Sequence, residues 1–165
     1  MTLLIRRLQP ADADAYRALR LEALSRCPCA FEHGHDEEAM LGADDFALRL
    51  DEIAVFGAVV DGRLCGIAAF TRPPFAKKRH KGVLRGVYVQ PGIRCEGVGT
   101  ALVAAVVEHA RQEVVQLHAA VATTNQPARR LYAKLGFTPY GIEPRALRVG
   151  GTCYDQELLV LPLGS

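Results

Sequence analysis

The stretch of sequence that decides the fold runs from Leu84 to Gly99 and reads L-R-G-V-Y-V-Q-P-G-I-R-C-E-G-V-G. Its first half contains the β-formers V-Y-V at 87–89, and the Pro91-Gly92 pair that follows is typical of a turn. From Thr100 to Glu113 the chain then has few residues that oppose a helix. We therefore predict a strand, a turn and the start of a helix.

The turn between this strand and this helix has the features of a phosphate-binding loop. Gly97 and Gly99 have no Cβ atom, so backbone N–H groups at the start of the helix can approach an anion closely, and the helix dipole favours negative charge there. Two common nucleotide motifs are absent from the stretch, because it matches neither G-x-G-x-x-G nor G-x-x-x-x-G-K-[ST]. It contains Arg94-x-x-Gly97-x-Gly99 instead.

A second motif lies downstream at 125–137 and reads N-Q-P-A-R-R-L-Y-A-K-L-G-F. In this order, the two motifs resemble the acyl-CoA-binding core of the GNAT superfamily of N-acetyltransferases. The close resemblance covers residues 83–137, and the rest of the chain is compatible with one such domain in length and element order. We therefore expect a single N-acetyltransferase domain over residues 1–165.

The composition of the whole chain fits a single domain and selects no macromolecular partner. Its 165 residues, 50% of them hydrophobic, can bury one sizeable core. A net charge of +2 at pH 7 and a pI near 8.3 are too mild to indicate a nucleic-acid surface or an anionic membrane. The start M-T-L-L-I-R-R-L-Q lacks the pattern of a signal peptide, and the apolar runs are too short for a membrane span. We expect a cytoplasmic monomer or homodimer without nucleic-acid or membrane partners.

The five cysteines show no metal-binding pattern. Cys27-Pro-Cys29 is not a C-x-x-C motif, and no histidine stands at a zinc-finger spacing from it. We interpret the thiols as reduced and mostly structural, and we predict no metal cofactor.

Hydrophobic spacing and turn residues divide the rest of the chain into strands and helices. The strands are expected at 3–8, 54–60, 64–71, 82–90 and 114–121, with two more between 138 and 161. The first helix is expected to start at a cap on Asp12 or Asp14 and to end before Pro28, and further helices are expected at 36–50, 97–113 and from 125 on. Asp61-Gly62 predicts a type I′ turn, and Gly150-Gly151 can turn the last hairpin. The fold class is α/β, or α+β by some schemes. We expect a GNAT-like, mixed and mostly antiparallel sheet of six to seven strands with a central parallel pair, flanked by about four helices.

The resemblance implies where acetyl-CoA would bind as the co-substrate. In the family the two parallel strands, here 82–90 and 114–121, splay apart, the pantetheine arm fills the gap, and the pyrophosphate rests on the loop at 94–99. Converging backbone amides can stabilise its charges without a metal. The residues assigned to acetyl-CoA in this way are Val87, Tyr88, Val89, Arg94, Cys95, Glu96, Gly97, Val98, Gly99, Thr100, Asn125 and Arg129.

Three of these residues, Cys95, Glu96 and Asn125, have features that bear on their assignment to the co-substrate. Cys95 replaces the glycine most often found after the arginine, and Glu96 puts a carboxylate beside the anion. Binding by backbone amides is compatible with both, since an outward-pointing, screened Glu96 would cost on the order of 1 kcal/mol or less. Asn125 can cap the helix that follows it or bond to the cofactor arm, and the sequence leaves both roles open.

Tyr132 corresponds to the tyrosine that, in the family, protonates the CoA thiolate as it leaves. A phenol with a pKa near ~10 stays protonated at neutral pH and can donate to a thiolate within hydrogen-bond reach. The alternative is that Tyr132 is only a core residue on the apolar face of its helix. The context L-Y-A-K-L-G-F favours the catalytic role.

The sequence does not identify the general base, because no Asp or Glu occurs between Arg79 and Gln90. A water relay is one solution, and the candidate side chains are Glu32, His33, His35, His80 and Glu143. The residues expected to contact the acceptor are Phe31, Glu32, Arg85 and Glu143.

Arg85 is the most specific of the acceptor candidates. Regular strand alternation would put it on the face of Val87 and Val89, where a guanidinium could bind an anionic group of the acceptor. The alternative is an internal salt bridge, with Glu143, Asp155 or Glu157 as the partner.

Together these features predict an enzyme that moves the acetyl group from acetyl-CoA to a primary amine by direct attack, without a covalent acyl-enzyme. The expected acceptor is a small amine or an amino-acid-like metabolite. A protein N-terminus or a lysine side chain is the alternative acceptor. A non-catalytic acyl-CoA-binding sensor domain and a general nucleotide-phosphate binder are the rival functions.

Overall fold

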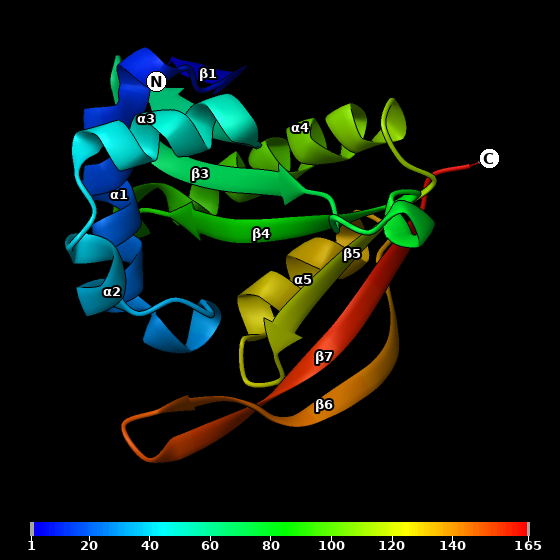
Figure 1. The fold of residues 1–165 in the computed structure, drawn as a ribbon. Coiled ribbons are helices and arrows are strands. Elements are labelled where there is room, and N and C mark those ends of the chain that lie inside the picture. Colours follow the sequence, from blue (N-terminus) through cyan, green and yellow to red (C-terminus); the bar gives the residue numbers. More distant parts are fainter. Residues whose placement is uncertain (1, 165) are drawn as a thin grey trace.

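The fold was obtained as a computed structural model that describes residues 2–164, with the backbone alone at residues 94–96. Within residues 2–164, seven strands form one sheet (Figure 1). They are β1 (Leu3–Arg7), β2 (Ala54–Val60), β3 (Arg63–Thr71), β4 (Lys81–Val89), β5 (Gln116–Ala122), β6 (Thr138–Val149) and β7 (Thr152–Pro162). The order is β1-β2-β3-β4-β5-β7-β6, and all neighbours are antiparallel except the parallel pair β4–β5. This confirms the expected mixed sheet with one central parallel pair.

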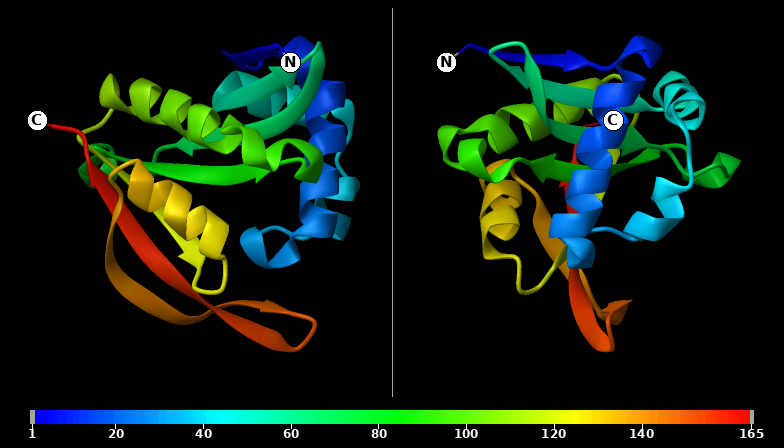
Figure 2. Two further views of the ribbon diagram at one scale, coloured as in Figure 1. Left: turned by 180° about the vertical axis from the view of Figure 1, so that it is seen from behind. Right: turned by 90° about the vertical axis from the view of Figure 1, so that its left-hand side faces the viewer.

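Five α-helices occur in the described residues: α1 (Ala13–Arg26), α2 (His35–Ala39), α3 (Ala43–Glu52), α4 (Val98–Arg111) and α5 (Gln126–Lys134). Short 3-10 turns precede or join them at η1 (Pro10–Asp12), η2 (Pro28–Ala30), η3 (Ala76–Lys78) and η4 (Pro91–Glu96). Helices α4 and α5 cover one face of the sheet, and α1 and α3 cover the other (Figure 2).

The two faces of the sheet carry two separate hydrophobic cores. On one face, the fully buried Val98, Leu102 and Val106 of α4 pack with strand residues such as Leu84. On the other face, the buried side chains of α1 and α3 surround Ile67 and Tyr88, with Tyr16 and Phe46 in edge-to-face contact at 5.6 Å between ring centroids. The central strands are therefore buried on both sides, as their apolar sequences require.

The predicted helix at 36–50 is wrong in its continuity, because the structure has α2 and α3 there as two helices. Gly42 adopts an extended conformation between them, and its amide donates to the Asp45 carboxylate at 2.9 Å. This contact starts a new helix at Ala43. The apolar residues on the two sides of Gly42 have a similar helical spacing, so the sequence pattern does not show that one helix ends and another begins.

The two predicted hairpin turns form as expected. Asp61 and Gly62 have φ values of 49° and 83°, and Gly150 and Gly151 have values of 56° and 84°. Two consecutive positive φ angles are the geometry that a type I′ connection needs. The turns fix the registers of the β2–β3 and β6–β7 pairs near their loops.

A β-bulge at Gly86 changes the face on which Arg85 lies. Ile67 of β3 pairs with Tyr88, but Ala69 pairs with Arg85, so β4 has one residue more than β3 in this interval. Gly86 lies inside the interval with φ 60°. Because directly paired residues share a face, Arg85 lies with Ala69 and Tyr88 on the α1 and α3 side.

The prediction that Arg85 shares a face with Val87 and Val89 is therefore wrong. Val87 and Val89 pack on the α4 side together with Leu84. Regular alternation would put Leu84 on the opposite face from Val87 and Val89, because their positions differ by an odd number. An extra residue in a strand inverts the alternation beyond it, and the sequence pattern does not reveal the insertion.

The parallel pair is short, and its two strands separate along their length. Pairing joins Lys81 with Gln116, Gly82 with Leu117 and Val83 with His118, and it ends there. Beyond this point β4 pairs with β3 alone and β5 with β7 alone. Figure 1 shows the two strands diverging toward the end of β4. Residues 84–87 of β4 and 119–122 of β5 therefore have no partner strand on the side that faces this gap.

Candidate active site

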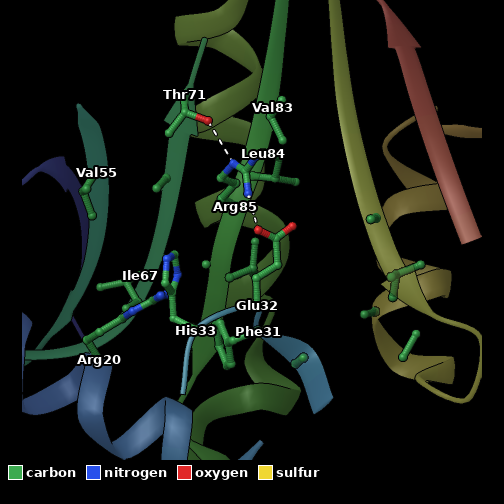
Figure 3. A pocket seen from close by; sticks show the side chains of 18 of the residues that line it. Arg20, Phe31, Glu32, His33, Val55, Ile67, Thr71, Val83, Leu84 and Arg85 are labelled. Carbon is green, nitrogen blue, oxygen red and sulfur yellow. Dashed lines mark hydrogen bonds and ion pairs between the residues drawn. The ribbon is translucent and has the colours of Figure 1, made fainter. Parts of the chain in front are cut away.

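A cavity of about 450 Å³ occupies the gap between β4 and β5 and continues through the sheet to both faces. On the α5 side its wall includes Val87, Asn125 and Tyr132. On the other side the wall comes from α1, α3, β3 and the loop after α1, with Arg20, Phe31, Glu32, His33 and Arg85 among its residues (Figure 3). One opening in the sheet thus connects two chemically different surfaces.

The α4 end of the site has the backbone arrangement of an anion-binding loop. Gly97 is the N-cap of α4 in the left-handed conformation, φ 76° and ψ 10°, and no side chain caps this helix. The first-turn amides of Val98, Gly99 and Thr100 therefore have no side-chain acceptor at the cap. In contrast, the Asn125 side chain caps α5 by accepting from the Ala128 amide at 3.3 Å.

Glycine at position 99 allows α4 to start close to α5. A Cβ atom at Gly99 would lie 3.0 Å from a methyl carbon of Leu131, so a larger residue would require the Leu131 side chain to move. At Gly97 a Cβ atom would meet nothing within 4 Å. The side chains of Arg94, Cys95 and Glu96 lie outside the described residues, so their assignment to the cofactor stays a prediction.

The remaining residues assigned to the cofactor take several positions. Val87 and Asn125 line the cavity. Tyr88 and Val89 are buried in the two cores, and the Tyr88 hydroxyl donates to Glu22 of α1 at 2.7 Å. Arg129 donates to the Thr123 carbonyl at 3.3 Å and to the Glu157 carboxylate at 3.1 Å, which ties the β5–α5 connection to β7.

Tyr132 faces the cavity from α5 and is nearly buried, with 7% of its surface exposed. Its ring packs against Phe137 at 5.6 Å between centroids. Burial raises the pKa of the Tyr132 hydroxyl to about 12, because the charged phenolate would be desolvated. The hydroxyl is therefore a proton donor at every pH near neutrality. Its position in the cavity allows a catalytic role as well as a packing role.

Two arginines and one glutamate form a buried ion cluster on the other side of the sheet. Arg20 of α1 donates to both carboxylate oxygens of Glu38 at 3.0 and 2.9 Å, and Arg49 of α3 donates to one of them at 3.0 Å. Burial pushes the pKa of Glu38 up, but the two arginines outweigh it, so the pKa is below its ordinary value. Burial also opposes the charge of Arg49, but bonds with Tyr16 and Glu38 leave its pKa raised.

Three of the four residues expected to contact the acceptor line this side of the cavity: Phe31, Glu32 and Arg85. Arg85 donates to the Thr71 hydroxyl at 3.1 Å and to the Glu32 carboxylate at 3.1 Å, as the dashed lines of Figure 3 show. The predicted salt-bridge partners of Arg85 are therefore wrong, and the partner is Glu32. Glu143 is exposed on β6 and is not part of the cavity wall.

Of the proposed general bases, Glu32 and His33 line the cavity. Both are more than half exposed, and His33 lies 3.7 Å from the Glu38 carboxylate. His35 contacts Asp36 on the surface, and His80 lies beside a separate shallow pocket near Arg72 and Glu113. This placement reduces the candidates at the cavity to two side chains and leaves the water relay open.

Sequence reasoning missed the arginines of the ion cluster. Arg20 follows Tyr16 by four residues and precedes Leu24 by four, so it stands inside the apolar stripe of α1. A charged residue in such a position is rarely buried without a partner, so the position of Arg20 indicated a buried ion pair. No signal in the sequence connected it with Glu38, which lies on a different helix.

The described residues lack features of two other classes of protein. No group of three or more His, Cys, Asp or Glu side chains there is placed to hold a metal ion. None of the helices in this part of the chain is both long enough and apolar enough to cross a membrane.

Comparison with known proteins identifies the class. The family model for the acetyltransferase (GNAT) family matches residues 16–137, so the match takes in α1, the sheet centre, the α4 loop and α5. The chain belongs to the acetyltransferase (GNAT) family.

Particular relatives agree with this membership. The chain is 34% identical over 99 residues to the N-alpha-acetyltransferase RimI of Mycobacterium tuberculosis, and the match spans 58% of each protein. A GNAT-family acetyltransferase from Streptococcus pneumoniae has a similar crystal structure, with a TM-score of 0.88 and 25% identity over 99% of this chain and 100% of that one. The protein yncA of Salmonella typhimurium, whose structure contains its cofactor acetyl-CoA, has the same fold, with a TM-score of 0.88 and 22% identity over 100% and 96% of the two chains.

Proposed function

We propose that this protein transfers the acetyl group of acetyl-CoA to a primary amine, by direct attack of the amine. The observation that carries the proposal is the cavity between β4 and β5, which joins the α5 side with Tyr132 to a polar surface on the other side of the sheet. The uncapped N-terminus of α4 follows β4 in the chain, and its residues 97–100 are not part of the cavity wall. Family membership supports the same activity. We take residues 1–165 as one domain for this purpose and keep a cytoplasmic location as an expectation.

The residues of the chain fit acetyl-CoA as the co-substrate. The open edges of β4 and β5 beyond Val83 present backbone donors and acceptors that match the amide groups of a pantetheine arm. The amides of Val98 to Thr100 suit a pyrophosphate, because they are uncapped and lie at the positive end of α4. Bound there, acetyl-CoA would supply an activated acetyl thioester.

The protein's own groups would then assist the loss of a proton from the nitrogen and the departure of the sulfur. The neutral amine forms the new C–N bond as the C–S bond breaks, and the nitrogen loses one proton to a base, for which Glu32, His33 or a water held by them is available. The Tyr132 hydroxyl can donate a hydrogen bond to the departing sulfur, and the proton taken from the nitrogen reaches the thiolate through the base and solvent. The net products are an acetamide and a free thiol, so no covalent acyl-enzyme is needed.

We further propose that the acceptor is a small amine or an amino-acid-like metabolite. The η2 turn lies against β5 and β6 and therefore crosses the acceptor side of the gap. The cavity of about 450 Å³ would also have to hold the acetyl end of the co-substrate, which leaves room for a small molecule. A protein N-terminus is the second candidate, because the relative from Mycobacterium tuberculosis is an N-alpha-acetyltransferase.

Thiol release from acetyl-CoA in the presence of amines tests the proposed activity. We expect free thiol in stoichiometric amounts with an N-acetylated product, identified by mass spectrometry, for some members of a panel of amino acids, small amines and peptides. Saturable acetyl-CoA binding without any product would favour the sensor domain instead. Product from peptides alone would favour the N-terminal acceptor.

A further inference from the structure

Arg20 is an almost completely buried arginine whose guanidinium reaches the cavity. Only 8% of the residue is exposed, yet Arg20 is part of the cavity wall. Its Nε and Nη2 atoms donate to Glu38, but Nη1 has no hydrogen-bond partner among the described residues. Among the described residues the fully buried side-chain nitrogen that lacks a partner is Arg129 Nε, so Arg20 Nη1 keeps some accessible surface and can be reached from the cavity.

The charges of the ion cluster do not balance. Arg20 and Arg49 contribute two positive charges and share the single carboxylate of Glu38, so the cluster carries one net positive charge. Glu32, the acidic residue of the described cavity wall, is already paired with Arg85 at 3.1 Å. His33, which lies 3.7 Å from Glu38, can add only positive charge. An anion supplied from the cavity would neutralise the cluster.

The free nitrogen lies where the sheet opens. A Cβ atom at Gly86 would be 3.0 Å from Arg20 Nη1, so the guanidinium rests against the bulge of β4. Figure 3 shows Arg20 extending from α1 into the part of the cavity that also contains His33, Glu32 and Arg85. Glycine at position 86 both permits the positive φ of the bulge and leaves space for this contact.

We propose that Arg20 Nη1 binds an anionic group of the acceptor, so that the acceptor is a small amine carrying a carboxylate or a similar oxyanion. The inference deepens the proposed function and rests on it. A guanidinium fixed by a bidentate bond to Glu38 is already oriented, so it binds an oxyanion with little further loss of side-chain freedom. A decarboxylated amine would leave this donor to water and the extra positive charge of the cluster uncompensated.

The test compares matched acceptors on matched variants of the full chain. The acceptors are α-amino acids, their carboxamides, and the corresponding aminoalkylphosphonates, with thiol release from acetyl-CoA as the readout. The main variant is Arg20→Lys, which keeps a charge near Glu38 but removes the forked guanidinium. The control is Arg17→Lys on the same helix, because Arg17 also donates to the α2–α3 connection, at Ala39 and Leu41, but is not part of the cavity wall.

We expect the parent and Arg17→Lys to prefer an acid over its carboxamide by about tenfold or more in kcat/KM, as one charge-assisted hydrogen bond provides. In Arg20→Lys the preference should fall to within about threefold. If a phosphonate were preferred over the carboxylate, the oxyanion that the site binds would be phosphate-like. Equal rates for acids and carboxamides in the parent protein would overturn the inference, whether or not the variant folds. Retention of the acid preference in folded Arg20→Lys, with its loss in Arg85→Gln, would overturn it too, because the anchor would then be Arg85.

A binding measurement separates this inference from the proposed function. The N-acetylated forms of the same acids and carboxamides are compared by thermal shift with CoA present. Acid-selective stabilisation without any turnover would support the anion site and contradict the acetyl transfer. Turnover without acid selectivity would support the transfer and contradict the anion site. If neither appears, both are wrong.

Discussion

At the scale of one residue, the burial of Tyr132 affects both the packing of the protein and the proposed chemistry. The same burial that places its ring against Phe137 raises the pKa of the hydroxyl to about 12. An ordinary thiol has a pKa of about 8.5, so complete proton transfer from Tyr132 to a free thiolate is unfavourable. Its main contribution would therefore be a hydrogen bond to the sulfur while negative charge develops there.

We predict that Tyr132→Phe lowers kcat by about ten- to a thousandfold and leaves the affinity for acetyl-CoA nearly unchanged. Steady-state kinetics with calorimetric binding measures both quantities. Tyr140→Phe is a suitable control, because Tyr140 is 57% exposed and does not line the cavity. Equal turnover by Tyr132→Phe and the parent would leave Tyr132 with a packing role only.

The raised pKa of Tyr132 also predicts how stability changes at alkaline pH. Because the folded-state pKa is about 12 and the ordinary value is 10.0, the contribution of Tyr132 is fully present below about pH 10 and is lost as the pH rises through about 12. Denaturant unfolding of the parent should show a steeper loss of stability across this window than unfolding of Tyr132→Phe. Parallel curves for the two proteins would mean that the hydroxyl is not desolvated.

At the scale of the elements, turn chemistry predicted more than strand periodicity did. Asp61-Gly62 and Gly150-Gly151 identified their hairpins because two positive φ angles leave few other structures. The bulge at Gly86 and the break at Gly42 were not predicted, since a single residue that shifts a register or restarts a helix leaves the apolar pattern almost intact. The error on the face of Arg85 followed directly from the missed bulge.

The loop before α4 gives the prediction that belongs to this scale. Gly97→Asp should weaken CoA binding by at least about tenfold, because it puts a negative charge at an uncapped helix N-terminus that is proposed to hold a pyrophosphate. Gly97→Asn is the matched control, since it has the same shape without the charge and tolerates the left-handed conformation. Calorimetric titration with CoA measures the difference. Because a Cβ atom there would meet nothing within 4 Å, both variants should fold, and equal affinities would remove the loop from the binding site.

At the scale of the whole molecule, the side chains of the site come from segments that are distant in the sequence, and local sequence patterns do not show that they meet. The two motifs on β4–α4 and α5 were recognisable because each is local. The pairing of Arg20 with Glu38 and of Arg85 with Glu32 depends on how α1, α2 and the sheet pack, and residues 53 positions apart meet in the second pair. The fold class was therefore predictable, but the buried cluster of Arg20, Glu38 and Arg49 was not.

The central claim is that acetyl-CoA binds in the gap where β4 and β5 separate, and amide hydrogen exchange tests it most directly. With saturating acetyl-CoA, we predict slower exchange in the segments 84–89 and 119–122 and in the first turn of α4, and no change in the distant edge strand β1. The Gly97→Asp variant should show this protection only at higher concentrations of acetyl-CoA. Binding that protects other segments and leaves the two gap-facing strands unchanged would contradict the account, and so would an absence of binding.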